Sequence, residues 1–164
     1  MIPFNKAGIL GREREFMAEA LERGPIMGDG PFGKRCEALL EAETGARRAL
    51  LTTSCTHALE MCALLLDIRP GDEVVVPSFT FVSAANAFVL RGATPVYADI
   101  RGDTLNLDER LLAPLLTERT RAVVAVHYGG VACEMDTLLA LTGKASVPVV
   151  EDAAHALFGK YRGR

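Results

Sequence analysis

Two carboxylates and a histidine follow a strongly apolar run near the end of the chain. The run Val147–Val150 is uncharged and mostly β-branched, and Glu151, Asp152, two alanines and His155 come directly after it. This pattern predicts a strand of a parallel sheet, buried on both faces. Ligands of open α/β sheets bind just beyond the carboxyl ends of the strands, where Asp152 could pair with a protonated ring nitrogen of a planar cofactor. Alternatively, Asp152 caps the next turn and His155 is a surface residue.

Small hydroxyl residues stand at the start of a helix predicted over residues 55–66. Ser54, Cys55 and Thr56 lie where free backbone N–H groups and the helix dipole favour an anion, so they are candidates for holding a phosphate. Simple capping of the helix by Ser54 explains the same pattern. Neither glycine-rich nucleotide fingerprint, Gly-x-Gly-x-x-Gly or Gly-x-x-x-x-Gly-Lys-Ser/Thr, occurs in the chain, which argues against a dinucleotide fold and a P-loop.

Two aromatic residues flank a threonine after another predicted strand. Phe79 and Phe81 stand at a strand end in a chain with only 6% aromatic residues, and a flat ring there could stack on a planar cofactor. The other interpretation is that both side chains belong to the hydrophobic core.

The rest of the chain supplies the elements that must position these residues. Strands are predicted at 47–52, 73–76, 94–98, 122–126 and 147–150, alternating with helices at 55–66, 82–90, 108–116 (capped by Asp108) and 134–141. Such alternation indicates an α/β fold with a parallel sheet and right-handed crossovers. Two amphipathic helices, at about 11–23 and 31–43, precede it. We therefore expect a helical segment at 1–46 and an α/β domain at 47–164.

Composition narrows the functional class. The 164 residues are 49% hydrophobic and 24% charged, with a net charge of −3 and scattered cations, which does not suggest a nucleic-acid surface. No apolar run approaches the length of a membrane span, and residues 1–6 do not resemble a signal peptide, so we expect a cytoplasmic protein. The four cysteines match no common zinc spacing and are expected to be reduced, with no metal site.

Taken together, these features resemble one family over essentially the whole chain. The chain is similar to the DegT/DnrJ/EryC1/StrS family, whose members are pyridoxal-phosphate (PLP)-dependent sugar aminotransferases of fold type I, the aspartate-aminotransferase-like fold. Within that family the sequence motifs are most similar to those of the subgroup that forms dTDP-4-amino-4,6-dideoxy-D-galactose. The resemblance is carried by Ser54–Thr56, Pro70–Val74, Pro77–Phe81, Ala85–Ala93, His127–Thr137, Glu151–His155 and Tyr161–Arg164.

The resemblance implies a reaction and a set of cofactor contacts. The family transfers an amino group from L-glutamate to the 4-keto carbon of a nucleotide-linked 6-deoxysugar. By resemblance, Asp152 pairs with the pyridine nitrogen of PLP, His155 contacts the region of its phenolic oxygen, and Phe81 stacks on its ring. Ser54, Cys55 and Thr56 belong to the phosphate-binding stretch. His155 departs from the glutamine usual in the closest subgroup, although other family members have histidine there.

The Schiff-base lysine of the family has no counterpart in this sequence. Lys6, Lys34, Lys144 and Lys160 match no such position, so no catalytic residue is assigned. We therefore expect the chain to be an N-terminal portion with an incomplete large domain, inactive by itself, from a protein that is a homodimer at full length. A sugar dehydratase of the same family, a non-catalytic fragment that binds a phosphoryl ligand or dimerises, and a nucleotide-binding oxidoreductase are the alternatives.

Overall fold

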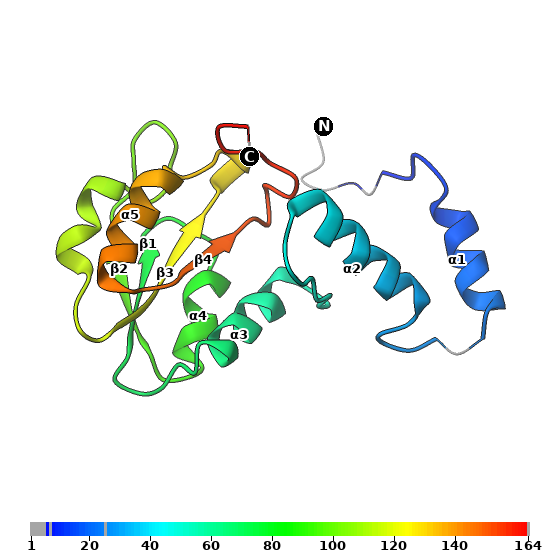
Figure 1. Ribbon diagram of the computed structural model, residues 1–164, viewed down its shortest axis with the longest axis horizontal. Coiled ribbons are helices and arrows are strands. Elements are labelled where there is room, and N and C mark those ends of the chain that lie inside the picture. Colours follow the sequence, from blue (N-terminus) through cyan, green and yellow to red (C-terminus); the bar gives the residue numbers. More distant parts are fainter. Residues whose placement is uncertain (1–5, 7, 25, 164) are drawn as a thin grey trace. The chain divides into compact units, whose positions relative to one another are not determined.

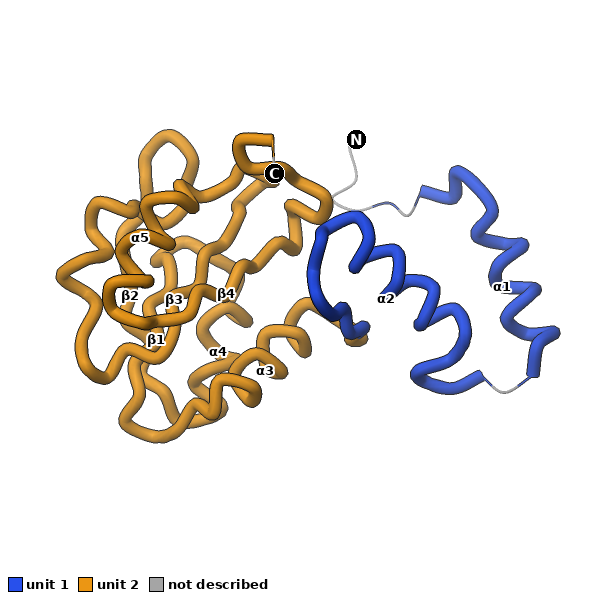
Figure 2. Tube along the Cα trace, viewed as in Figure 1, with its two compact units in different colours: residues 1–51 blue, residues 52–164 orange. Residues whose placement is uncertain are grey.

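The computed structural model describes residues 6, 8–24 and 26–163. The chain divides into two compact units, residues 1–51 and 52–164 (Figure 2). The division falls five residues after the expected boundary at 46/47. Each unit is described by itself below.

The first unit contains the two helices expected from the amphipathic pattern. Helix α1 spans Glu13–Glu22 and helix α2 spans Pro31–Thr44. Helix α2 has proline in its first turn and ends at Gly45, whose left-handed φ of 71° suits a residue without a side chain. The rings of Phe16 and Phe32 meet edge to face with centroids 5.9 Å apart, which joins the two helices through an aromatic contact.

The strand predicted at 47–52 is absent from the structure, and this prediction was wrong. The backbone N–H groups of Ala49 and Leu51 donate to the carboxylates of Glu41 and Glu37 on α2 instead of to a neighbouring strand. Leu50 and Leu51 are both exposed. An extended segment becomes a strand only where another strand accepts its hydrogen bonds, and a β-like composition does not supply that partner.

The second unit is built on four parallel strands. Strands β1 (Glu73–Pro77), β2 (Thr94–Ala98), β3 (Thr120–Val126) and β4 (Val149–Asp152) lie in the order β2-β1-β3-β4. Every neighbouring pair is parallel. The α/β class with a parallel sheet is therefore confirmed.

Helices cover both faces of this sheet (Figure 1). Helices α3 (Cys55–Leu65) and α4 (Ser83–Val89) pack on one face, where Val74 and Val76 of β1 contribute to the core. Helix α5 (Met135–Ala145) packs on the other face, where Val75 points. Successive residues of a strand face opposite sides, so the uninterrupted valine run fills both cores.

Two further expectations are corrected by the structure. Strand β4 is an edge strand among the described residues, and Val149 and Val150 are only half-buried, not buried on both faces. The helix predicted at 108–116 is instead two short 3₁₀ turns, η1 (Glu109–Leu111) and η2 (Ala113–Leu115). Asp108 caps the first turn as expected, but Pro114 has no N–H group and its ring would clash with the preceding turn of an α-helix.

The sheet contains a topological switch point between β1 and β3. The chain leaves β1 through α4 to reach β2 on one side, and leaves β3 through α5 to reach β4 on the other. The loops that follow β1 and β3 therefore diverge, and such a crevice is where open α/β sheets bind ligands. The rings of Phe79 and Tyr128, one from each loop, meet there with centroids 4.7 Å apart.

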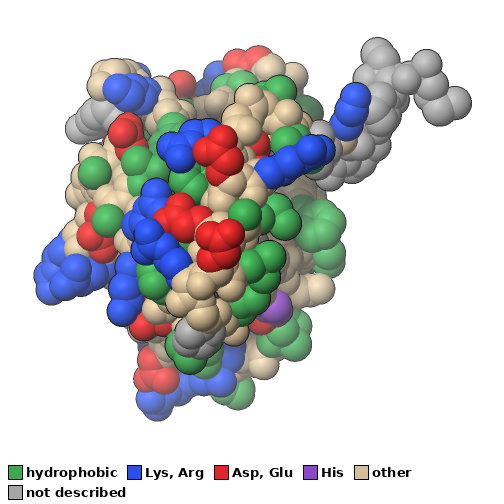
Figure 3. All heavy atoms as spheres, turned by 90° about the vertical axis from the view of Figure 1, so that its right-hand side faces the viewer, with side chains coloured by type: hydrophobic (Ala, Val, Ile, Leu, Met, Phe, Trp, Pro, Cys, Tyr) green, Lys and Arg blue, Asp and Glu red, His purple; other side chains and the backbone are tan. Residues whose placement is uncertain are grey.

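The surface carries charges of both signs. The face in Figure 3 shows basic and acidic side chains interspersed with hydrophobic ones. Across the described part of the chain, no helix combines the length and apolar character that crossing a membrane requires.

A buried carboxylate at the start of β1 makes the stability of the sheet pH-dependent. Glu73 accepts a hydrogen bond from Thr117 Oγ1 at 2.6 Å and from Arg119 Nε at 2.9 Å, and these contacts lower its pKa below the ordinary 4.5. A lowered pKa in the folded state stabilises the fold above about pH 4.5 and loses that contribution as the pH falls. We expect Glu73→Gln to destabilise the protein at pH 7 and to differ progressively less from wild type towards pH 3. Urea unfolding across this pH range measures the difference in stability between the variant and wild type, and Glu118→Gln, at an exposed position, is the control. A difference that does not change with pH would contradict the prediction.

Candidate functional site

The carboxyl group of Asp152 forms the centre of the candidate site. It lies at the carboxyl end of β4 and is 7% exposed. Its Oδ1 accepts the Ala154 N–H at 3.1 Å and the Cys55 thiol at 3.5 Å. Among the described residues, no lysine, arginine or histidine forms an ion pair with it. Asp152 thus caps the following turn, as one interpretation predicted, and is also a buried acid available to a cation.

Helix α3 brings its first turn to this carboxyl group. Ser54 Oγ accepts the His57 N–H at 3.2 Å, so Ser54 is the helix cap that the simpler interpretation predicted. The cap does not use the N–H groups of Cys55 and Thr56, which stand at the positive end of an 11-residue helix. The contact between Cys55 and Asp152 places this positive end of the helix directly beside the acid.

The aromatic loop after β1 is exposed and is not part of the core. Phe81 is 70% exposed and Phe79 is also exposed, which contradicts the core interpretation of these two rings. The hydroxyl oxygen of Thr80 between them is buried and has no hydrogen-bond partner in the described structure. A buried polar atom without a partner is uncommon in folded proteins and calls for an explanation.

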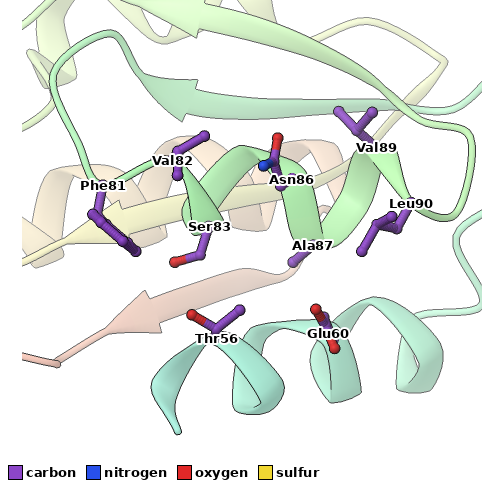
Figure 4. Close-up of a pocket in the computed structure, with 9 residues that line it drawn as sticks. All are labelled: Thr56, Glu60, Phe81, Val82, Ser83, Asn86, Ala87, Val89 and Leu90. Atoms are coloured by element: carbon purple, nitrogen blue, oxygen red, sulfur yellow. The ribbon is translucent and has the colours of Figure 1, made fainter.

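A cavity of about 390 Å³ lies between α3 and α4 (Figure 4). Thr56 and Phe81, two of the six predicted site residues, line it together with residues of α4. Figure 4 shows Thr56 and Glu60 on α3 facing Ser83 and Ala87 on α4 across the gap. In the described residues, Asp152 and His155 do not line this cavity. The predicted residues therefore form two adjoining groups: Thr56 with Phe81 at the cavity, and Cys55 with Asp152 at the strand end.

His155 joins the site through the loop that follows β3. Its Nδ1 accepts the Gly129 N–H at 3.2 Å, and its ring meets that of Tyr128 edge to face with centroids 5.7 Å apart. The side chain is exposed, as the surface interpretation predicted, but two contacts hold it against the turn after β3. It therefore has a defined position three residues beyond Asp152.

Sequence reasoning did not single out a pair of side chains next to Asp152, in which His127 is buried and Glu151 is exposed. His127 follows β3, and its Nε2 lies 3.0 Å from Glu151 Oε2, while its Nδ1 accepts the Cys133 N–H at 3.2 Å. This hydrogen bond from His127 lowers the pKa of Glu151. The backbone N–H of His127 donates to the Asp152 carbonyl at 3.1 Å, so His127 is hydrogen-bonded to both Glu151 and Asp152 at the end of β4. In the sequence, the only indication of this pair is that His127 and Glu151 each directly follow a predicted strand.

The Cys55–Asp152 contact has a measurable chemical consequence. Partial burial and the neighbouring Asp152 carboxylate raise the pKa of Cys55 from 9.0 to about 11. The thiolate is the reactive form, so Cys55 should alkylate slowly at pH 8 although its residue is exposed. We expect Asp152→Asn to speed the alkylation of Cys55 by up to about tenfold at fixed pH, since one pKa unit changes the thiolate fraction tenfold.

Peptide mass mapping of iodoacetamide-treated protein measures this rate. Cys133 is the internal control, because burial raises its pKa to about 12 and Asp152 is not among the causes. An unchanged Cys55 rate in Asp152→Asn would show that the two side chains are apart in solution.

Comparison with known proteins places the chain in a family. The family model of the DegT/DnrJ/EryC1/StrS aminotransferases matches residues 9–164. A UDP-4-amino-4-deoxy-L-arabinose–oxoglutarate aminotransferase of Shewanella sediminis is 38% identical over 162 residues, 99% of this chain and 42% of that protein. The spore coat polysaccharide biosynthesis protein SpsC of Bacillus subtilis is 41% identical over 163 residues, with the same coverage.

Solved structures agree with this assignment. DesV of S. venezuelae, solved in complex with a ketimine intermediate, has a TM-score of 0.87 at 37% identity, covering 92% of this chain and 40% of DesV. The PLP form of the sugar aminotransferase Spr1654 of Streptococcus pneumoniae has a TM-score of 0.87 at 32% identity, covering 95% and 43%.

The fold and the site together define an α/β domain of the PLP-dependent aminotransferases, fold type I. The chain belongs to the DegT/DnrJ/EryC1/StrS aminotransferase family. It spans about two-fifths of the length of the curated relatives it matches.

Proposed function

We propose that the protein is a PLP-dependent aminotransferase that transfers the amino group of L-glutamate to the 4-keto carbon of a nucleotide-linked sugar. The observation that carries this proposal is the buried Asp152 carboxyl group, which lacks a cationic partner in the described structure and lies against the start of α3. The cofactor requires an acid beside its ring nitrogen and a cradle for its phosphate, and this arrangement offers both next to each other.

The residues present fit this cofactor. Asp152 would hold the protonated pyridine nitrogen, and the N–H groups of Cys55 and Thr56, with the capped start at Ser54, would hold the phosphate. Phe81 would cover the ring, because its side chain is 70% exposed and can contact a ligand. The unpartnered Thr80 hydroxyl would offer a further polar contact. When bound, the cofactor supplies the electron sink, and these residues bind and orient it.

The second unit would then form the first half of the cofactor-binding large domain. Its parallel sheet presents Asp152 and the switch point between β1 and β3 at one edge, and the helical first unit precedes it. The Shewanella relative and Spr1654 are named aminotransferases, which favours amino transfer over a sugar dehydratase or a non-catalytic fragment. We further propose that the protein is a cytoplasmic homodimer. Native mass spectrometry would test the dimer by measuring its mass.

Two sources support the sugar class. The name of the Shewanella relative joins a 4-amino sugar, UDP and oxoglutarate, and oxoglutarate is the keto acid that glutamate leaves after giving up its amino group. The motif resemblance favours a dTDP-linked 4-keto-6-deoxysugar, with dTDP-4-amino-4,6-dideoxy-D-galactose as the product. The amino group at position 4 and the glutamate donor are common to both, whereas the nucleotide differs.

The test uses the protein at its natural length. Incubation with PLP, reduction with borohydride and intact mass measurement should show one covalent pyridoxyl group per chain. The 164-residue segment treated alike should show no specific adduct, because its lysines match no Schiff-base position. Oxoglutarate release is then followed with dTDP-4-keto-6-deoxyglucose and with a UDP-linked 4-ketopentose. Turnover of the UDP sugar alone would replace the dTDP assignment, and absence of any pyridoxyl group would refute the function.

A further inference from the structure

A short turn after β3 connects the candidate site to the interior. The 3₁₀ turn η3 spans Tyr128–Gly130, closed by hydrogen bonds from the Gly130 N–H to the His127 carbonyl and from the Val131 N–H to the Tyr128 carbonyl, both at 3.1 Å. Gly129 has φ 60°, a left-handed conformation that glycine adopts without strain. Neither of the two hydrogen bonds that close the turn uses the Gly129 N–H, so this group can donate to a partner outside the turn.

The side chain of Asn106 fastens both ends of this turn. Its Oδ1 accepts the Tyr128 N–H at 2.9 Å, and its Nδ2 donates to the Val131 carbonyl at 2.9 Å. The two partners fix which amide atom is oxygen and which is nitrogen, because one is a donor and the other an acceptor. Asn106 is only 1% exposed, so losing either bond would leave a buried polar group without a partner.

The turn held by Asn106 also holds His155. The Gly129 N–H donates to His155 Nδ1 at 3.2 Å, and the Tyr128 ring contacts the imidazole from the side. The missing side chain of Gly130 permits close approach, since a β-carbon there would lie 3.1 Å from the His155 carbonyl oxygen. An imidazole nitrogen that accepts a hydrogen bond carries no proton, so the neutral ring must carry its proton on Nε2.

We propose that Asn106 is a positioning residue for the site: by holding both ends of the Tyr128–Gly130 turn, it keeps the Gly129 N–H on His155 Nδ1 and fixes the ring as the Nε2–H tautomer. The free Nε2–H is then a donor for an acceptor oxygen of the ligand. That the ligand is PLP rests on the proposed function, but the effect of Asn106 on the histidine does not. Asn106 itself touches no ligand and acts only through the turn.

The proposal is tested by NMR on the ligand-free protein at natural length. Long-range ¹H–¹⁵N spectra distinguish a protonated from an unprotonated ring nitrogen, and His155→Gln assigns the signal. We expect wild type to show Nε2 protonated and Nδ1 unprotonated. In Asn106→Ala the two shifts should move towards each other as both tautomers become populated. Asn106→Asp, which keeps the acceptor for Tyr128 but loses the donor to Val131, should fall between.

Thr142→Val is the matched control for lost buried polarity. Thr142 is equally buried and its hydroxyl donates to the Leu138 carbonyl at 2.9 Å on α5, away from the turn. It should destabilise the fold without moving the His155 shifts. Unchanged His155 shifts in folded Asn106→Ala would overturn the proposal. If that variant does not fold, Asn106→Asp takes its place in the comparison, and a wild-type spectrum with Nδ1 protonated would by itself overturn the proposal.

A PLP titration separates this proposal from the proposed function. If the protein binds PLP, Asn106→Ala should weaken binding about tenfold, the effect of losing one well-placed hydrogen bond, while Thr142→Val should not. If wild type does not bind PLP, the proposed function fails, and the NMR result still tests the role of Asn106. Equal PLP affinity of wild type and Asn106→Ala, with the tautomer changed, would overturn the link from the histidine to the ligand.

Discussion

Asp152→Asn should lower the transaminase activity of the natural-length protein by about 10- to 100-fold. A hydrogen bond to a charged partner is worth about 1.5–3 kcal/mol, and each 1.4 kcal/mol is a factor of ten in rate. Asparagine has the shape of aspartate and can still accept the Ala154 N–H, so the turn after β4 should persist. The variant therefore removes the negative charge that would keep the cofactor ring protonated and leaves the surrounding structure in place.

Glu151→Gln is the matched control for this substitution. Glu151 is the neighbouring residue on β4, and the change is again from a carboxylate to an amide of similar shape. Its side chain is 55% exposed and lies against His127, not against Cys55. We expect it to keep activity within a few-fold of wild type and to bind PLP normally.

Two measurements decide the outcome. Steady-state kinetics with the keto sugar give the loss of activity, and the absorbance spectrum of bound cofactor across pH reports the protonation of its ring. Wild-type activity of Asp152→Asn, or an equal loss in Glu151→Gln, would remove Asp152 from the role proposed for it.

The sheet was predictable because its residues carry the information locally. Valine runs bounded by turn residues predicted β1, β3 and β4, and Thr94–Ala98 was predicted with its observed bounds. The segment at 47–52 has a similar local composition but meets carboxylates of α2 in place of another strand. A local sequence pattern indicates a preference for an extended conformation. Whether the segment pairs as a strand depends on which other segments of the chain lie beside it in the fold. The same limit explains why β4 was expected to be buried on both faces.

The site was predictable only in part for a related reason. Asp152 could be placed at a strand end from the sequence, since parallel strands share one functional edge. Its contact with Cys55 joins residues 97 positions apart, and no spacing rule reveals such a pair. Asn106 lies in a loop beyond β2, and its importance depends on the turn 22 residues later whose N–H it accepts. The chemistry of single residues is visible in a sequence, but the residues that hold them in position are mostly not.

The largest expected effect on stability comes from helix α5. Leu138 on α5 is fully buried at 0% exposure, in the core that α5 forms with Val75 and Val123. Truncating a buried leucine to alanine costs about 2–5 kcal/mol through lost burial and the cavity left behind. A domain is stable by only about 5–15 kcal/mol, so we expect Leu138→Ala to lose a large share of this stability and to lower the urea midpoint markedly.

Leu139→Ala provides the control at the next position of the same helix. The substitution is identical and so is its effect on helix propensity, but Leu139 is 50% exposed. We expect a loss of about 1 kcal/mol or less, as for a partly exposed side chain. Because α5 leads directly into β4, a destabilised α5 should also release the strand that ends in Asp152. Hydrogen exchange of the β4 amides should therefore speed up in Leu138→Ala and not in Leu139→Ala, and equal exchange in both variants would mean that the position of Asp152 does not depend on this core.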